Sequence, residues 1–390
     1  MKIGFFASYL NHHQKPFCNE LSKMKDVDFT FVSFKPMRAE RVALGYEDMN
    51  DYSYVLKAYE SDETYKKAEQ LALECDVAVF GNAPIEFLMK RAERNKPTIV
   101  YAERMFKKGF YQAFSPRAII RMKKTHSSFR NKRVYLFCAG AFTAADYTHF
   151  GAYRNKTYKW GYFPEVKRYE SIEALIESKK KKSILWVGRM LDWKHPEYAI
   201  HLAKRLKKAG YDFTLNMIGT GPLEEGLKEK VKKQNLSSCV SFLGAMPPET
   251  VRQYMEESEI FLFTSDRQEG WGAVLNESMN SGCAVVASHI IGSVPFMLQH
   301  GTNGFIYKNK NQKDLYKKVA ALLNSPNTVK QFGLSAYHSC VTEWNPENAA
   351  LRFYRVAEAL INNQDIHKLF ENGVCSKAEI LKDGWFHVNQ

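Results

Sequence analysis

The sequence predicts an α/β protein with two doubly wound domains, each built on a parallel sheet with helices on both faces. Two observations predict this class. The chain has 390 residues, 45% of them hydrophobic, which is long for one core and fits two domains. Short, almost uninterrupted apolar runs also alternate with stretches of helical periodicity. Such runs are typical of strands buried on both faces of a parallel sheet.

The first half contains five candidate strands. They read KIGFFA from Lys2, DFTFVSF from Asp28, DVAVFG from Asp76, TIVYAE from Thr98 and VYLFCAG from Val134. The first run is short and leads into polar residues without a small-residue cleavage site, so we expect a buried strand and not a signal peptide. No apolar stretch reaches the roughly 18 residues that a membrane-spanning helix needs.

The second half repeats this rhythm without repeating the sequence. Its candidate strands read SILWVGR from Ser183, FTLNMIG from Phe213, VSFLGA from Val240, IFLFTS from Ile260 and CAVVAS from Cys283. A Gly/Pro-punctuated segment, WGYFPEV, precedes them, followed by a helical stretch that is expected to end in the lysines at 179–182. We expect an N-terminal domain over 1–165, a C-terminal domain over 166–345, and a crossover helix at about 346–390 that returns to the first domain.

Seven cysteines are scattered along the chain. They are Cys18, Cys75, Cys138, Cys239, Cys283, Cys340 and Cys375. Their number is odd, no pair has CxxC spacing, and several lie in apolar runs. This pattern predicts buried thiols in a reducing compartment such as the cytoplasm, and neither a disulfide framework nor a zinc site.

The formal net charge is +14, and much of it is concentrated in one segment. Residues 104–133 hold ten Lys or Arg and no Asp or Glu, interleaved with aromatic and aliphatic residues. This composition suits an anionic membrane surface or a phosphate-bearing acceptor, and a solvated basic face fits it equally well. No nucleic-acid-binding motif is visible, so nucleic acid is not an expected partner.

Ligands of doubly wound sheets bind outside the carboxyl ends of the strands, so the loops there are candidate site segments. After the strand at Ser183, Arg189 and Lys194 lie in the loop VGRMLDWKHPE. Two fixed cations can offset the charge of a leaving diphosphate without a metal. By themselves, two surface bases near a helix start explain this loop equally well.

Two further loops are rich in glycine. Gly219 and Gly221 flank Thr220 in MIGTGPLEEGL, where a tight strand–helix turn is the alternative explanation. In SDRQEGWGAVLNES, glycines and a helix start suit an anionic or hydroxyl-rich ligand. Its carboxylates can accept hydrogen bonds from vicinal hydroxyls, although an ordinary amphipathic helix with an exposed Glu also fits. The residues concerned are Glu269, Gly270, Trp271, Gly272, Ala273 and Glu277.

Taken together, Arg189–x4–Lys194, GTGP, Glu269–x7–Glu277, SGCAVVAS and HGTNGFIY resemble the donor domain of family 4 glycosyltransferases over about residues 183–350. The resemblance implies the GT-B fold, two Rossmann-like domains facing across a cleft, and retaining transfer from a nucleotide sugar. It implies Arg189 and Lys194 at the diphosphate, Glu269 with the backbone of 270–273 at the sugar, and Glu277 at the ribose.

The first half resembles the family more loosely. YLNHHQKPFCNEL, YAERMFKKG and YKWGYFP are similar to a subset that builds bacterial capsule or other surface polysaccharides, which implies a glycan or lipid-diphosphate acceptor at the inner membrane face. Many relatives have a His after the fourth strand, where this chain has Glu103. Glu103, His12 and His13 are therefore candidates on the acceptor side, and a loop role fits each of them as well.

Neither a cofactor nor a metal is expected, because Asp146 and Asp266 lack DxD-type pairing. Three alternatives remain. The first is a phosphorylase on the same fold, which would use inorganic phosphate. The second is a Rossmann dehydrogenase, which would need G-x-G-x-x-G where the chain reads SYLNHHQ. The third is a non-catalytic basic protein that binds membranes or nucleic acid.

Overall fold

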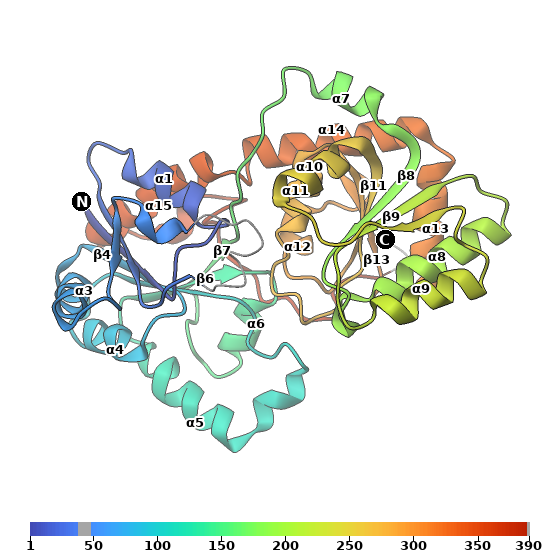
Figure 1. Ribbon diagram of the computed structural model, residues 1–390. Helices are drawn as coiled ribbons and strands as arrows, with labels where there is room; N and C mark the ends of the chain where they lie inside the picture. The colour runs from blue at the N-terminus through green and yellow to red at the C-terminus, as the bar shows by residue number, and fades with distance from the viewer. Residues whose placement is uncertain (38–47, 388–390) are drawn as a thin grey trace. The chain divides into compact units, whose positions relative to one another are not determined.

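The computed structural model describes residues 1–37 and 48–387, drawn in colour in Figure 1. The chain divides into two compact units. The first unit contains residues 1–165 and 343–382. The second contains residues 166–342 and the described residues from Asp383 onward.

The first unit is built on a parallel sheet of seven strands in the order β3-β2-β1-β4-β5-β6-β7. The five predicted strands form its centre, because their apolar side chains are buried on both faces. The short edge strands β3 and β7 were not predicted. The strands are β1 (Lys2–Ala7), β2 (Asp28–Ser33), β3 (Val55–Lys57), β4 (Val77–Phe80), β5 (Thr98–Ala102), β6 (Val134–Ala139) and β7 (Thr157–Trp160).

Helices cover both faces of this sheet, with α1 and α15 on one face and α3 and α4 on the other (Figure 1). Phe17 of α1 and Phe353 of α15 meet edge to face, 5.6 Å apart. The helices are α1 (Lys15–Ser22), α3 (Asp62–Glu74), α4 (Ile85–Glu93), α5 (Pro116–Thr125), α6 (Thr143–Thr148) and α15 (Pro346–Ile361), with short 3-10 turns η1 (Met49–Asp51), η2 (Phe110–Phe114), η3 (Ser127–Phe129) and η5 (Ile366–Lys368).

The second unit has a six-stranded parallel sheet in the order β10-β9-β8-β11-β12-β13. Figure 1 shows α8, α9 and α13 on one face and α10, α11 and α14 on the other. Its strands are β8 (Lys180–Val187), β9 (Thr214–Ile218), β10 (Val240–Phe242), β11 (Ser258–Phe263), β12 (Ala284–Ser288) and β13 (Gly304–Tyr307). Its helices are α7 (Ile172–Ser178), α8 (Pro196–Lys208), α9 (Glu224–Lys233), α10 (Pro248–Glu257), α11 (Val274–Asn280), α12 (Val294–Met297), α13 (Gln312–Leu323) and α14 (Pro326–Thr342), with the 3-10 turn η4 (Asp192–Lys194).

The start of β8 differs from the prediction. The lysine run was expected to end the preceding helix, but α7 ends at Ser178 and the strand begins at Lys180. The buried Lys179 ammonium donates to the backbone oxygens of Met255 and Glu256, at 2.8 and 2.9 Å. The lysines of β8 are exposed because they lie at the start of the strand, before it enters the core.

The crossover helix is shorter than the predicted range of about 346–390. α15 ends at Ile361, because Asn363 adopts a left-handed conformation with φ of 55°. The Gln364 N–H then donates to the Ala359 carbonyl at 2.8 Å, which closes a Schellman-type helix end. The chain beyond it runs without another α-helix through the described residues, and those from Asp383 onward belong to the second unit.

The seven thiols are free, and all but Cys239 are buried, as predicted. None of the helices in the described part of the chain is both long and apolar enough to cross a membrane.

Candidate functional site

The second sheet has a topological switch point between β8 and β11. Strands are added on one side of β8 up to β10 and then on the other side from β11 to β13. In open α/β sheets, ligands bind at such a point, outside the carboxyl ends of the strands. Two loops meet there: residues 188–195 after β8 and residues 264–273 after β11.

An ion pair joins these two loops. The Lys194 ammonium contacts the Glu269 carboxylate, and the two side chains are only 15% and 11% exposed. The Ser265 hydroxyl also donates to Glu269 at 3.0 Å. The structure therefore brings together two residues predicted to act on one ligand, while Arg189 lies exposed at the end of β8.

Backbone and core contacts brace the same loops. The Asp266 N–H donates to the Trp193 carbonyl at 2.9 Å. The Thr264 hydroxyl donates to the Lys194 carbonyl at 2.7 Å and accepts from the buried Trp186 indole at 2.8 Å. The backbone and the side chain of Lys194 are thus both held by protein contacts alone.

His195 adds a second ionic brace, which sequence reasoning missed. Its φ of 51° lies in the left-handed region, which is costly for a residue other than glycine. Its ring nitrogens lie 2.7 Å from Glu197 and 3.7 Å from Asp266. Burial lowers the pKa of His195, but the two carboxylates more than offset this and raise it to about 9. In the sequence, its position between Lys194 and the proline that starts α8 was the one feature that could have indicated this role.

The glycines of the β9 loop have a clear packing role. A Cβ on Gly219, which has a φ of 121°, would lie 2.0 Å from the Gly188 carbonyl oxygen. One on Gly221 would lie 2.7 Å from the Met190 oxygen. These positions allow the β9 loop to contact the β8 loop, with the Met190 N–H donating to Thr220 at 2.8 Å.

The Glu269–Ala273 segment can offer backbone to a ligand but not the Trp271 ring. That indole is fully buried and donates to Asn276 at 2.8 Å. Gly272 has a φ of 86°, and a Cβ there would lie 2.3 Å from the Phe263 ring. Tight packing against the core therefore fixes the path of this loop.

Glu277 lies half-buried on α11, the next helix along the chain. Burial raises its pKa, and the nearby Arg252 opposes that rise. Arg252, on α10, donates to the Glu277 carbonyl at 3.2 Å and to the Asn280 side chain at 2.8 Å. Sequence reasoning missed Arg252, because no motif links it to the loop.

In the first unit, the acceptor-side candidates gather around Tyr162. Its hydroxyl donates to Glu103, which also pairs with Lys107. The His13 ring stacks on Tyr162 at 5.1 Å and 6°, and the His12 ring lies 3.6 Å from that of His13. Burial raises the pKa of Tyr162 well above its usual value, and the neighbouring acidic groups add to this. Sequence reasoning did not single out Tyr162.

Within residues 1–37 and 48–387, no three His, Cys, Asp or Glu side chains are grouped so that they could hold a metal ion. Asp146 has a structural role, because its buried carboxylate accepts the N–H groups of Met105 and Phe106 at 2.8 and 3.0 Å.

Residues 167–339 match the family model for glycosyl transferases group 1. The chain is 30% identical over 182 residues to the amylovoran biosynthesis glycosyltransferase AmsK of Erwinia amylovora, covering 45% of this chain and 44% of the relative. It is 23% identical over 168 residues to the poly(ribitol-phosphate) alpha-N-acetylglucosaminyltransferase of Staphylococcus aureus, covering 43% and 34%. The chain thus spans less than half the length of these curated relatives.

The structure resembles that of HepE from Anabaena in complex with UDP. The TM-score is 0.68 at 13% sequence identity, and the match covers 92% of this chain and 100% of the other. This likeness shows the fold. The predicted class, two Rossmann-like units of the kind found in GT-B glycosyltransferases, is confirmed.

Proposed function

We propose that the chain is a retaining glycosyltransferase. In this proposal it moves a sugar from a nucleotide-diphosphate donor to a glycan or lipid-diphosphate acceptor in surface polysaccharide synthesis. The Lys194–Glu269 pair carries the proposal, because it lies at the switch point of the second sheet and inside the matched segment. The amylovoran relative and the neighbour with bound UDP support the donor and product classes.

The donor would rearrange the ion pair. Its diphosphate competes with Glu269 for the Lys194 ammonium, and Arg189 supplies a second cation. The released Glu269 carboxylate then accepts hydrogen bonds from sugar hydroxyls. Glu277 takes the ribose hydroxyls in the same way. The backbone of Gly219, Gly221 and residues 270–273 lines the rest of the site.

We propose that transfer keeps the anomeric configuration of the sugar, as the resemblance to family 4 glycosyltransferases implies. The bond from the anomeric carbon to the diphosphate breaks as the bond to the acceptor oxygen forms on the same side, and the acceptor proton passes to the leaving phosphate. Arg189 and Lys194 offset the charge that develops on that phosphate, which is the main catalytic contribution expected of fixed cations. On this basis we propose that no metal is needed.

The first unit would handle the acceptor. In this proposal Glu103 and His13, which both contact Tyr162, orient its hydroxyl group. Free thiols and the basic segment 104–133 fit a protein of the cytoplasm that works at the inner membrane face.

A screen of nucleotide sugars by thermal shift, followed by a transfer assay, tests the proposal. We expect one donor to stabilise the chain, and Arg189→Ala and Lys194→Ala each to lower turnover by about 100-fold or more. Lys204→Ala, an exposed change of equal charge on α8, is the matched control. Absence of donor binding, or near-wild-type transfer by Arg189→Ala, contradicts the assignment.

Two further arms of the same assay test the finer points. Transfer should survive a chelator, and activity restored only by Mn²⁺ or Mg²⁺ would refute the metal-free mechanism. Inorganic phosphate should not be required. A sugar phosphate product formed only when phosphate is added would identify a phosphorylase.

A further inference from the structure

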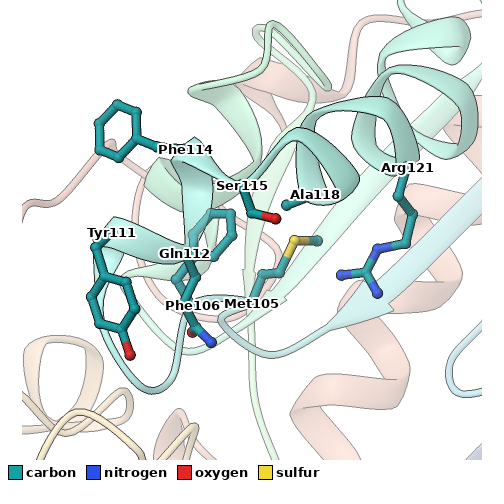
Figure 2. A pocket seen from close by; sticks show the side chains of 8 residues that line it. All are labelled: Met105, Phe106, Tyr111, Gln112, Phe114, Ser115, Ala118 and Arg121. Carbon is teal, nitrogen blue, oxygen red and sulfur yellow. The ribbon is translucent and has the colours of Figure 1, made fainter.

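A pocket opens in the first unit between the loop after β5, the 3-10 turn η2 and helix α5 (Figure 2). Its volume is about 500 Å³, which falls in the range of small-ligand sites. Apolar side chains and one cation form most of its wall. They are Met105, Phe106, Tyr111, Phe114, Ala118 and Arg121.

The floor of this pocket is fixed by a buried carboxylate. Asp146 of α6 accepts the backbone N–H groups of Met105 and Phe106 and lies 3.7 Å from the buried Arg104 guanidinium. The Phe106 ring is 2% exposed and packs edge to face on Phe110. The concave shape is therefore part of the folded structure and does not need a ligand to form.

The rim, in contrast, exposes large apolar side chains. Tyr111 is 69% exposed and Phe114 is 67% exposed, and Ile120, which lies on α5 outside the pocket lining, is also 67% exposed. Helix α5 buries only Met122 fully, so the residues that the structure describes leave most of its surface uncovered. Apolar side chains exposed together in this way mark a binding surface.

Charge identifies the class of partner. Residues 104–133 contain no acidic side chain, and α5 exposes Arg117, Arg121, Lys123 and Lys124 beside the apolar rim. Exposed aromatic residues among several cations match the boundary between lipid headgroups and acyl chains. A nucleic acid would satisfy the cations but has no aliphatic chain to fill the pocket.

We propose that α5 and η2 rest on an anionic bilayer, and that the pocket takes one acyl chain of a phospholipid whose phosphate pairs with Arg121. The bilayer contact rests on the membrane placement proposed above for residues 104–133, whereas the acyl-chain site needs no donor and no acceptor and can be tested without transferase activity.

Flotation of the full chain with phosphatidylglycerol/phosphatidylcholine vesicles tests the surface. We expect binding at about 0.1 M salt, weakening toward 0.5 M, and little binding to pure phosphatidylcholine. Arg121→Gln should weaken binding about fivefold, and Phe114→Ser about tenfold or more. Lys66→Gln on α3 and Ile380→Ser, which is also exposed, are matched controls that should bind like wild type.

Ala118→Trp separates the pocket from a flat surface. It fills the cavity and keeps every charge, so it should weaken vesicle binding severalfold, whereas on a flat membrane-facing surface an added Trp should strengthen it. Phosphatidylglycerol with a photoreactive group on its acyl chain should crosslink to wild-type residues between 105 and 121.

Three results would overturn the proposal. One is equal binding to neutral and anionic vesicles. Another is wild-type or stronger binding by Ala118→Trp, or the absence of crosslinks to wild-type residues between 105 and 121. The third is complete competition by a single-stranded oligonucleotide in the crosslinking experiment. Donor hydrolysis measured without lipid reports separately on the transferase proposal.

Discussion

Replacing Lys194 by Met separates the structural role of the Lys194–Glu269 pair from its proposed role in catalysis. The side chains are 15% and 11% exposed, so the methionine leaves Glu269 as a largely buried charge with the Ser265 hydroxyl as a remaining donor. Removing one partner of a buried ion pair costs about 3–5 kcal/mol. Because Glu269 keeps some contact with water and one hydrogen bond, we expect about 3 kcal/mol for unfolding of the second unit.

The second substitution of the cycle removes the stranded charge. In Lys194→Met/Glu269→Gln, the amide can still accept from Ser265, and no carboxylate is left buried. We expect the double variant to recover about 2 kcal/mol of the loss, because the main penalty is the unpaired charge and not the missing contact. Transfer should stay at the level of the single variant, since methionine cannot offset the charge of a diphosphate.

Urea unfolding followed by tryptophan fluorescence measures the first effect, and initial transfer rates measure the second. Lys233→Met is the control. Its pair with Glu229 is 78% and 69% exposed, so the change should stay within about 0.5 kcal/mol. A Lys194→Met variant as stable as wild type would refute the structural reasoning, and transfer regained by the double variant would refute the catalytic role.

Three other changes test separate parts of the molecule. The pKa of His195 is raised to about 9, above its unfolded value near 6.5. The stabilisation from its two carboxylate contacts is therefore complete below about pH 6.5 and is lost as the pH rises through about 9. Asp266→Asn should flatten this part of a stability–pH profile, and an unchanged slope would contradict the contact. Gly219→Ala places a Cβ against backbone and should cost about 3 kcal/mol in urea unfolding, whereas Gly226→Ala, which meets nothing within 4 Å on helix α9, should stabilise by about 0.5 kcal/mol. Tyr162→Phe should lower transfer to the acceptor about tenfold and leave slow donor hydrolysis intact, and an equal fall in both rates would show that it does not act through the acceptor.

The fold was predictable wherever a strand is buried on both faces. Runs such as VYLFCAG around β6 are apolar throughout, because every side chain meets a helix layer. The missed strands β3, β7 and β13 are edge strands of three or four residues, whereas the equally short edge strand β10 was predicted because it lies in the longer apolar run VSFLGA. So short a strand shows too few residues for a period to be recognised, and its hydrogen bonds to one neighbour define it more than its composition does.

The candidate site divides in the same way. The residue types and spacings pointed to Lys194 and Glu269, but their pairing across 75 residues depends on the strand order of the sheet. His195, Arg252 and Tyr162 are recognisable only through their neighbours in space. For the glycines of the β9 loop, the sequence left open a close approach to a ligand and a tight turn. The structure shows that they allow close contact with the β8 loop, and their ligand role stays a prediction.

The ion pair also gives the proposed site a basis for choosing its ligand. A nucleoside diphosphate can replace Glu269 as the partner of Lys194, but it leaves the Glu269 carboxylate without a cation in a largely buried position. A nucleotide sugar supplies both an anion for Lys194 and hydroxyl donors for Glu269, so it avoids the cost of an unsatisfied buried charge. Glu269→Gln removes that cost for the diphosphate alone, and calorimetric titration should therefore show it binding nucleoside diphosphate more tightly than wild type does. A variant that binds the diphosphate no better than wild type would mean that Glu269 is not the group a donor must satisfy.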